Sequence, residues 1–306
     1  MAPTARGRFF FMLLRVDHPT LLTRGPKDSP LIPIGMKMNI KLSEIRVCVR
    51  GGGDIASGVA WRLFQCGFRV FITEIPKPMA VRRKVSFCEA VHDGHAEVEG
   101  VEALLIHGPS DTGPVWDKGR IPLLIDPECE IAKTMKPDII VDAILAKKNI
   151  GTAVNDAPLV IALGPGFEAG RDSDFVVETN RGHNLGRLLT GGSAEPDTGV
   201  PGPVHGFTVD RVIRAPCEGI WECDLKIGEI VKKGDVVGSV GTEAATARIN
   251  GVLRGVIRPG TPVRRGLKIG DIDPRGRKEY CHTISDKALA ISGGVLEGIL
   301  KVFARS

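Results

Sequence analysis

The sequence predicts an α/β Rossmann-like domain with a parallel sheet, then an all-β barrel-sandwich-hybrid domain of the biotinyl and lipoyl carrier type, then a C-terminal helix. Three observations predict this order. Residues 45–74 read as strand, glycine turn, helix and strand; short β runs repeat after residue 207; and apolar residues recur at helical spacing over 283–303. The expected divisions are 1–40, a disordered or miscalled N-terminal extension; 41–206, the α/β domain; 207–276, the β domain; and 277–306, the helix, which we expect to pack back on the α/β domain.

The N-terminal extension has prolines at 19, 26, 30 and 33, which disfavour regular structure. Its apolar block, residues 9–14, is shorter than the apolar region of a signal peptide. We expect translation to start at Met36 or Met38.

A glycine turn follows the apolar run 45–49. Gly51, Gly53 and Ala56 match the spacing G-x-G-x-x-G/A, and Glu74 ends the next apolar run. Glycines let a ligand approach the backbone, the helix N-terminus attracts anions, and a distal acid binds a ribose hydroxyl. The pattern favours a nucleotide or another small anionic ligand. The alternative is an empty turn that only packs helix on sheet.

Two further residues of this turn are candidate ligand contacts. Gly52 completes the glycine cluster, and Asp54 begins the helical pattern. A carboxylate at a helix start is favoured by the dipole but repels a phosphate. Asp54 is therefore also a candidate N-cap.

Basic residues follow the second strand. Pro76 and Pro78 predict a loop there, and Arg82 and Arg83 fall in an expected short helix. Guanidinium groups pair with phosphate oxygens, so these residues are candidates for a cationic wall beside the glycine turn. A solvated helix face explains them equally well.

Further strands are expected at 121–125, 138–145, 158–166 and 175–178, with a helix at 128–135. Asp142 lies inside an apolar run, where an unpaired carboxylate is costly. It is a candidate catalytic residue, and a buried structural acid is the alternative.

The run 178–186 is dense in hydrogen-bonding side chains. Asn180 and Arg181 suit a phosphate, a pterin edge or a base, and His183 is a candidate general acid or base. Structural capping is the alternative for His183. The Gly- and Pro-rich residues 190–206 predict an active-site loop, an interdomain linker or both.

From residue 207 an internal repeat appears, in which VKKGDVVGSV matches VRRGLKIGDI. A carrier domain needs a lysine at its hairpin tip, and the expected tip, GTEAATARING, has none. The carrier function is therefore excluded, and a docking or clamp role remains. In the terminal helix, Thr283 and Asp286 have the spacing of a capping box.

Composition excludes several classes of function. The net charge of +5 is modest and partly N-terminal, so no nucleic acid is expected as a partner. The seven cysteines form no C-x-x-C pair, which predicts reduced thiols in a cytoplasmic protein. No apolar run reaches the ~20 residues of a membrane span. His92 and His95 have no third ligand nearby, and the sequence gives no assignable metal site.

Several segments together resemble the YqeB-type family, whose members are named as accessory proteins of selenium-dependent molybdenum hydroxylase systems. The resemblance runs from about residue 43 to the end, through VRGGGDIASGVAWRL, EIPKPMAVRRKVSFCEAV, ALGPGF, VETNRGHNLGR and KIGDIDPRG. It implies a maturation factor with a Rossmann-like domain similar to that of XdhC-type chaperones.

The leading hypothesis is thus an accessory factor with a molybdenum hydroxylase client, binding a nucleotide or molybdenum-pterin cofactor at the glycine turn. The alternatives are an NAD(P)-dependent oxidoreductase and a non-catalytic docking scaffold. A homo-oligomer is left open.

Overall fold

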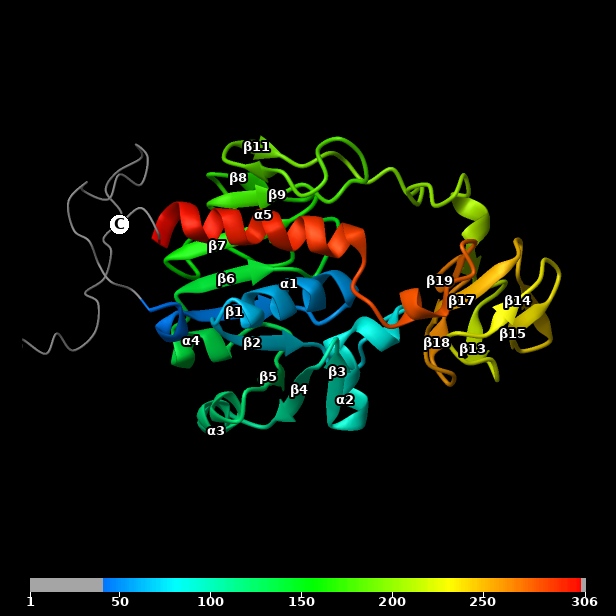
Figure 1. Cartoon of the computed structure of the whole chain (residues 1–306), viewed down its shortest axis with the longest axis horizontal. Helices are drawn as coiled ribbons and strands as arrows, with labels where there is room; N and C mark the ends of the chain where they lie inside the picture. The colour runs from blue at the N-terminus through cyan, green and yellow to red at the C-terminus, as the bar shows by residue number, and fades with distance from the viewer. Residues whose placement is uncertain (1–40, 304–306) are drawn as a thin grey trace, which may run out of the picture. The chain divides into compact units, whose positions relative to one another are not determined.

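The computed structural model describes residues 41–303. Its largest element is a nine-stranded sheet in the order β10-β9-β7-β6-β1-β2-β5-β4-β3 (Figure 1). The seven inner strands are parallel, while β3 and β10 pair antiparallel at the edges. The strands are β1 (Arg46–Arg50), β2 (Arg69–Glu74), β3 (His95–Val98), β4 (Val101–Ile106), β5 (Ile121–Ile125), β6 (Ile139–Asp142), β7 (Leu159–Leu163), β9 (Phe175–Val177) and β10 (Leu188–Leu189).

Helices cover both faces of this sheet. Side chains alternate along a strand, so Val47 and Val49 of β1 face one core and Cys48 faces the other. The first core includes residues of α1 (Asp54–Gln65) and α5 (Asp286–Phe303), which lie against each other in front of the sheet (Figure 1). The second includes residues of α3 (Thr112–Asp117) and α4 (Ile131–Met135). The remaining α-helix is α2 (Ala90–Asp93).

The chain between 200 and 282 forms two four-stranded antiparallel sheets, ordered β12-β19-β17-β14 and β16-β15-β13-β18. They enclose a separate core around Trp221, which is fully buried. The strands are β12 (Val212–Arg214), β13 (Gly219–Glu222), β14 (Ile230–Val231), β15 (Val236–Val240), β16 (Glu243–Thr246), β17 (Gly251–Val256), β18 (Pro262–Val263) and β19 (Lys268–Asp273). A two-stranded sheet joins β8 (Glu168–Ala169) to β11 (Gly192–Ser193).

The predicted fold class, a Rossmann-like parallel-sheet domain followed by a barrel-sandwich-hybrid domain, is wrong. The main sheet is mixed, and its antiparallel edge begins at a two-residue turn, Glu99–Gly100, where φ is +44° and +78°. Two positive φ values are the geometry of a tight hairpin, so the chain doubles back instead of crossing over through a helix. Strands β12 to β19 form two separate four-stranded antiparallel sheets, whereas the prediction was a single barrel-sandwich-hybrid domain.

Two local expectations are also wrong. The segment expected as a short helix around Arg82 and Arg83 forms only short 3-10 turns, η2 (Arg83–Val85) and η3 (Phe87–Glu89). The residue that caps α5 is Ser285, whose Oγ accepts the Ala288 N–H at 3.2 Å, so Thr283 is not the cap. The predictions for residues 1–40 lie outside the described residues, and the division of the chain at 206 and 276 stays a prediction.

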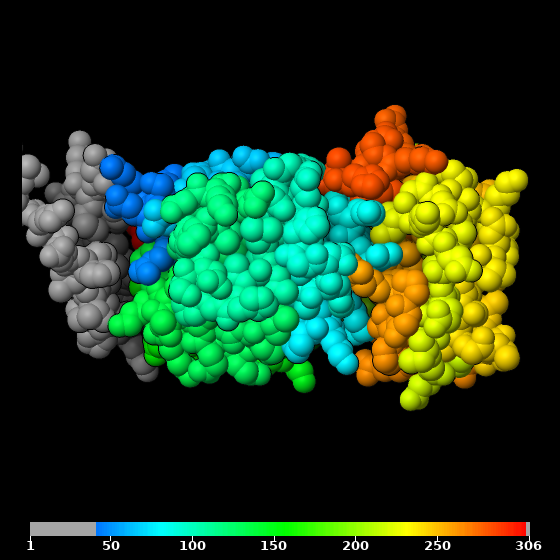
Figure 2. All heavy atoms as spheres, turned by 90° about the horizontal axis from the view of Figure 1, so that it is seen from below, coloured from blue at the N-terminus to red at the C-terminus, as the bar shows by residue number. Residues whose placement is uncertain are grey.

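The segment after β2 connects the main sheet to the antiparallel sheets. An added Cβ on Gly255 of β17 would lie 2.5 Å from the Val81 oxygen, so only glycine allows this approach. Arg83 Nε donates to the Val256 oxygen at 2.7 Å. Figure 2 shows the cyan surface of the segment after β2 meeting the orange surface of the residues near η6 (Lys278–Cys281). The two regions therefore share a packed backbone junction.

None of the helices in the described part of the chain is long and apolar enough to cross a membrane.

Candidate functional site

The glycine turn between β1 and α1 is partly closed by its own chain. Gly51 has φ +96°, and a Cβ on Gly52 would lie 2.8 Å from the backbone nitrogen of Cys88. Nothing lies within 4 Å of the position that a Cβ on Gly53 would take. The open approach to this turn is therefore at Gly53, directly before α1.

Glu74 closes the turn from the end of β2. Its Oε2 accepts the Gly52 N–H at 2.7 Å, and its Oε1 accepts the Ile75 N–H at 2.8 Å. Burial raises the pKa of the Glu74 carboxyl, and the two backbone hydrogen bonds oppose that rise. Glu74 stabilises the conformation of the turn. A ribose hydroxyl bound to Glu74 would have to donate to carboxylate oxygens that already accept the Gly52 and Ile75 N–H groups.

The N-terminus of α1 faces the open side of the turn. The N-cap is Gly53, which provides no side-chain hydrogen bond, so Asp54 is the first helical residue and not the cap. Its Oδ2 lies 3.6 Å from Nη1 of Arg82. A helix of twelve residues with uncapped N–H groups and a guanidinium beside them favours an anion.

Arg82 is 8% exposed. Its Nη2 donates to the Tyr280 and Thr283 oxygens at 3.0 and 2.9 Å, and its Nε is buried without a hydrogen-bond partner. The contacts with residues 280–283 place the guanidinium between α1 and the antiparallel sheets. Arg82 thus keeps one buried donor unsatisfied at the site.

Arg254 is the second buried guanidinium of the site. It is 9% exposed on β17, and its Nε also has no partner. Its counter-ion is Asp273, at 3.5 Å, but Arg275 already binds both oxygens of Asp273, at 2.9 and 2.6 Å. Burial, followed by the charge of Arg82, lowers the pKa of Arg254. The guanidinium groups of Arg82 and Arg254 therefore lie near each other, and acidic side chains neutralise their positive charges only in part.

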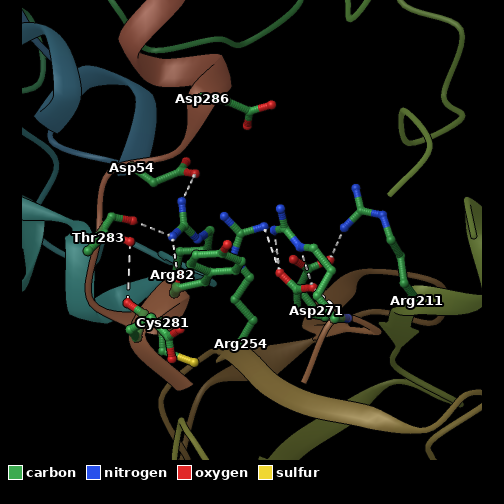
Figure 3. A network of polar contacts seen from close by, with 12 residues as sticks. Asp54, Arg82, Arg211, Arg254, Asp271, Cys281, Thr283 and Asp286 are labelled. Carbon is green, nitrogen blue, oxygen red and sulfur yellow. Dashed lines mark hydrogen bonds and ion pairs between the residues drawn. The ribbon is translucent and has the colours of Figure 1, made fainter. Parts of the chain in front are cut away.

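We call these residues the arginine cluster. In Figure 3 the guanidinium groups of Arg82, Arg254 and Arg211 lie in a row on the side that faces Asp54 and Asp286. The cluster consists of Arg82, Arg181, Arg211, Arg254 and Arg275 together with their acids Asp54, Asp271, Asp273 and Asp286.

Lys287 adds a further positive charge to this region. Its pKa is lowered by burial and by the charge of Lys147, with smaller effects of Arg181 and Lys268. Arg181 binds Asp286 through two hydrogen bonds of 2.6 and 2.9 Å, and this contact lowers the pKa of Asp286. The N-terminal end of α5 therefore borders the arginine cluster.

Other predicted site residues lie elsewhere. Arg83 points to the Val256 oxygen and is influenced by Glu89 and Arg258, so it belongs to the junction. Asn180 Nδ2 donates to Glu195 at 2.5 Å. His183 is exposed. Of the predicted residues, the structure brings together the glycine turn, Asp54, Glu74, Arg82 and, through Asp286, Arg181.

Asp142 belongs to a buried network under the turn. Its Oδ2 accepts the Thr152 hydroxyl at 2.5 Å, and Thr152 in turn accepts a hydrogen bond from Arg50. Arg50 Nη1 lies 3.9 Å from Asp142. Burial raises the pKa of the Asp142 carboxyl, which is 1% exposed. This arrangement satisfies Asp142 within the core, and in the described part of the chain none of its hydrogen bonds or ion pairs reaches the arginine cluster.

The sequence interpretation missed Arg254, Arg275, Asp271 and Asp273 as site residues. A usable signal was present, because Arg254 interrupts the apolar run of β17 as Asp142 interrupts β6. A charged residue inside a buried strand requires a partner. The described residues contain no group of three or more His, Cys, Asp or Glu side chains arranged to hold a metal ion.

No protein-family model matches the chain. The chain is 48% identical over 254 residues to the uncharacterized protein YqeB of Escherichia coli (strain K12), and the match covers 83% of the chain and 47% of YqeB. It therefore spans about half the length of the curated relative that it matches. This similarity supports the resemblance to the YqeB-type family.

Two solved structures show weak similarity. TcdA (CsdL) is 14% identical with a TM-score of 0.32, covering 87% of this chain and 90% of TcdA. An aspartoacylase family protein from Mesorhizobium loti is 12% identical with a TM-score of 0.22, covering 69% of this chain and 58% of that protein. At these TM-scores neither similarity carries an argument about function.

Proposed function

We propose that this chain binds a phosphate-bearing ligand between the N-terminus of α1 and the arginine cluster, and that it acts as an accessory factor in the maturation of a molybdenum hydroxylase. The ligand class is a nucleotide or the phosphate end of a molybdenum-pterin cofactor. Gly53 and the first N–H groups of α1 bind one side of the anion. Arg82 and Arg254 bind the other side.

The observation that carries the ligand class is the pair of buried guanidiniums, Arg82 and Arg254. Each is more than nine-tenths buried with an unpartnered Nε. A buried donor without an acceptor costs about 1–3 kcal/mol, and more when it is charged. A phosphate accepts from several guanidinium donors at once, so it removes this cost at both residues.

The biological role rests on the resemblance to the YqeB-type family. The segments that carry this resemblance include VRGGGDIASG, which forms the glycine turn, and KIGDIDPRG, which contains Asp271, Asp273 and Arg275. The same segments therefore provide both sides of the proposed ligand site. A client hydroxylase is the partner expected for this role.

Ligand-dependent thermal unfolding tests the proposal. The panel contains inorganic pyrophosphate, CTP, ATP, NAD, NADP, S-adenosylmethionine and molybdopterin-type ligands. A ligand at a hundred times its Kd stabilises the folded state by about 2.7 kcal/mol, which gives a clear rise in Tm. We expect at least one phosphate-bearing ligand to produce this rise in the wild-type chain.

Three variants locate the bound ligand. Arg254→Gln and Gly53→Val are both expected to remove the rise, the second because its side chain fills space that is open in the free protein. Arg264→Gln, an exposed arginine in the same antiparallel region, is the control and keeps the rise. No rise with any member of the panel would refute the ligand site, and a rise retained in Arg254→Gln would place the ligand elsewhere.

A further inference from the structure

A pair of thiols lies on the opposite face of β1 from α1. Cys48 Sγ and Cys129 Sγ are 3.5 Å apart, although the residues are separated by 81 positions in the sequence. Cys48 is fully buried on β1, and Cys129 is 7% exposed in the loop between β5 and α4. Only Cys129 therefore has surface through which a reagent from solution reaches the pair.

A buried cation lies beside these thiols. Arg50 is 4% exposed, its Nη2 donates to the Pro127 oxygen at 3.4 Å, and its Nε has no hydrogen-bond partner. The hydrogen bond from Cys48, the charge of Arg50 and a hydrogen bond from Thr73 lower the pKa of the Cys129 thiol against the effect of burial. Burial raises the pKa of Cys48. Cys129, which has the lowered pKa and the exposed surface, is thus the thiol that a reagent reaches first, and its Sγ lies in hydrogen-bonding contact with Cys48 Sγ.

We propose that Cys48 and Cys129 are a reversible dithiol–disulfide pair, in which Cys129 reacts first and Cys48 resolves the intermediate. The oxidant is a low-molecular-weight disulfide. This proposal is independent of the ligand site, because its residues lie on the other face of the sheet and contribute nothing to the arginine cluster.

The reaction balances in two exchange steps. The Cys129 thiolate attacks one sulfur of the external disulfide, which forms a mixed disulfide and releases one external thiolate. Cys48 then loses its proton and attacks Cys129 Sγ, which forms the internal disulfide and releases the second external thiolate. The protein loses two electrons and two protons, and the external disulfide becomes two thiols.

Differential alkylation of the full chain tests the proposal. The protein is equilibrated in oxidised and reduced glutathione, its free thiols are alkylated after unfolding, and the peptides are identified by mass spectrometry. We expect Cys48 and Cys129 to become protected together, in one linked peptide that dithiothreitol separates. Cys281, which is fully buried and donates to the Leu253 oxygen, provides the control and stays reduced.

Single variants test the order of reaction. In Cys48→Ser, glutathione is expected to remain attached to Cys129, whereas in Cys129→Ser no glutathione is expected on Cys48. Failure to obtain the linked peptide from the wild-type chain, or protection of the two residues at different glutathione ratios, would overturn the pair. Because this measurement uses the wild-type chain, it decides the question even if a variant does not fold.

Discussion

Two buried arginines, Arg50 and Arg254, have different surroundings and therefore different roles. Arg50 has a carboxylate at 3.9 Å, a hydroxyl and a backbone oxygen, all inside one core. Arg254 shares its acid with Arg275. Arg50 stabilises the sheet beside the thiol pair, whereas Arg254 is the arginine that the proposed function uses for ligand binding.

Glu74 gives a prediction at the same scale. Its pKa is raised from the usual 4.5, so the folded chain holds the proton to higher pH than the unfolded chain. The free energy of unfolding therefore falls as pH rises from about 4.5 through the raised pKa, by at most about 1.4 kcal/mol per pH unit. Glu74→Gln removes this dependence, and denaturant unfolding at a series of pH values measures it.

The control for Glu74→Gln is Glu97→Gln, an exposed acid on β3. It is expected to keep the wild-type slope of unfolding free energy against pH. If Glu74→Gln also keeps that slope, the burial of the Glu74 carboxylate does not control its protonation.

The residues of the glycine turn were predictable from the sequence, whereas the residues that face them were not. Gly51, Gly53 and Glu74 have a spacing set by the local path from strand to helix, so a short window predicts them. Arg254 and Asp273 come to the turn from strands about two hundred residues later in the chain. No local pattern places them there, because their position depends on the junction at Val81 and Gly255.

At the scale of elements, α5 packs closely because of one of its two adjacent glycines. A Cβ on Gly294 would lie 2.2 Å from the Gly186 oxygen, whereas nothing lies within 4 Å of a Cβ on Gly293. Gly294 therefore lets the helix approach the loop before β10.

The two glycines make a matched pair of variants. Gly294→Ala forces a backbone shift and is expected to destabilise the chain by about 1–3 kcal/mol. Gly293→Ala is expected to stabilise it by roughly 0.5–1 kcal/mol, because alanine has the higher helix propensity. Denaturant unfolding of both variants measures the difference, and equal effects would contradict the packing described here.

Sequence patterns located six of the seven inner strands of the main sheet, but not β4 or the two edge strands β3 and β10. The apolar runs that form β1, β2, β5 and β7 are long enough to read directly. The β3–β4 hairpin was missed because its turn, Glu99–Gly100, requires a positive φ at a glutamate. Glutamate seldom adopts a positive φ, so the sequence Glu99–Gly100 does not predict a tight turn.

At the scale of the whole molecule, Arg258 connects the region of the antiparallel sheets to η3 and α2, which follow β2 of the main sheet. Its Nε donates to Glu89 at 2.8 Å, and it also contacts Asp93. Glu89 is 7% exposed and its Oε1 has no partner, so Arg258 is its main compensation. The junction thus depends on an ion pair as well as on backbone packing.

Arg258→Gln is expected to lower the free energy of unfolding by about 1–3 kcal/mol, because Glu89 then keeps a buried charge without its cation. Adding Glu89→Gln to this variant should restore part of the loss, which a double-mutant cycle by urea unfolding measures. Arg264→Gln again serves as the exposed control. A loss as small as that of the control would show that the junction depends on packing alone.

The arginine cluster joins Asp54 and Arg82 to residues as late as Asp286. During synthesis the glycine turn leaves the ribosome long before β17, β19 and α5. A growing chain therefore holds only the glycine-turn half of the proposed site, and on this proposal capture of the ligand waits until residue 286 has left the ribosome. Under the proposed function, loading of the ligand is then a step that follows translation, and a chain that stops before residue 286 lacks the later half of the site.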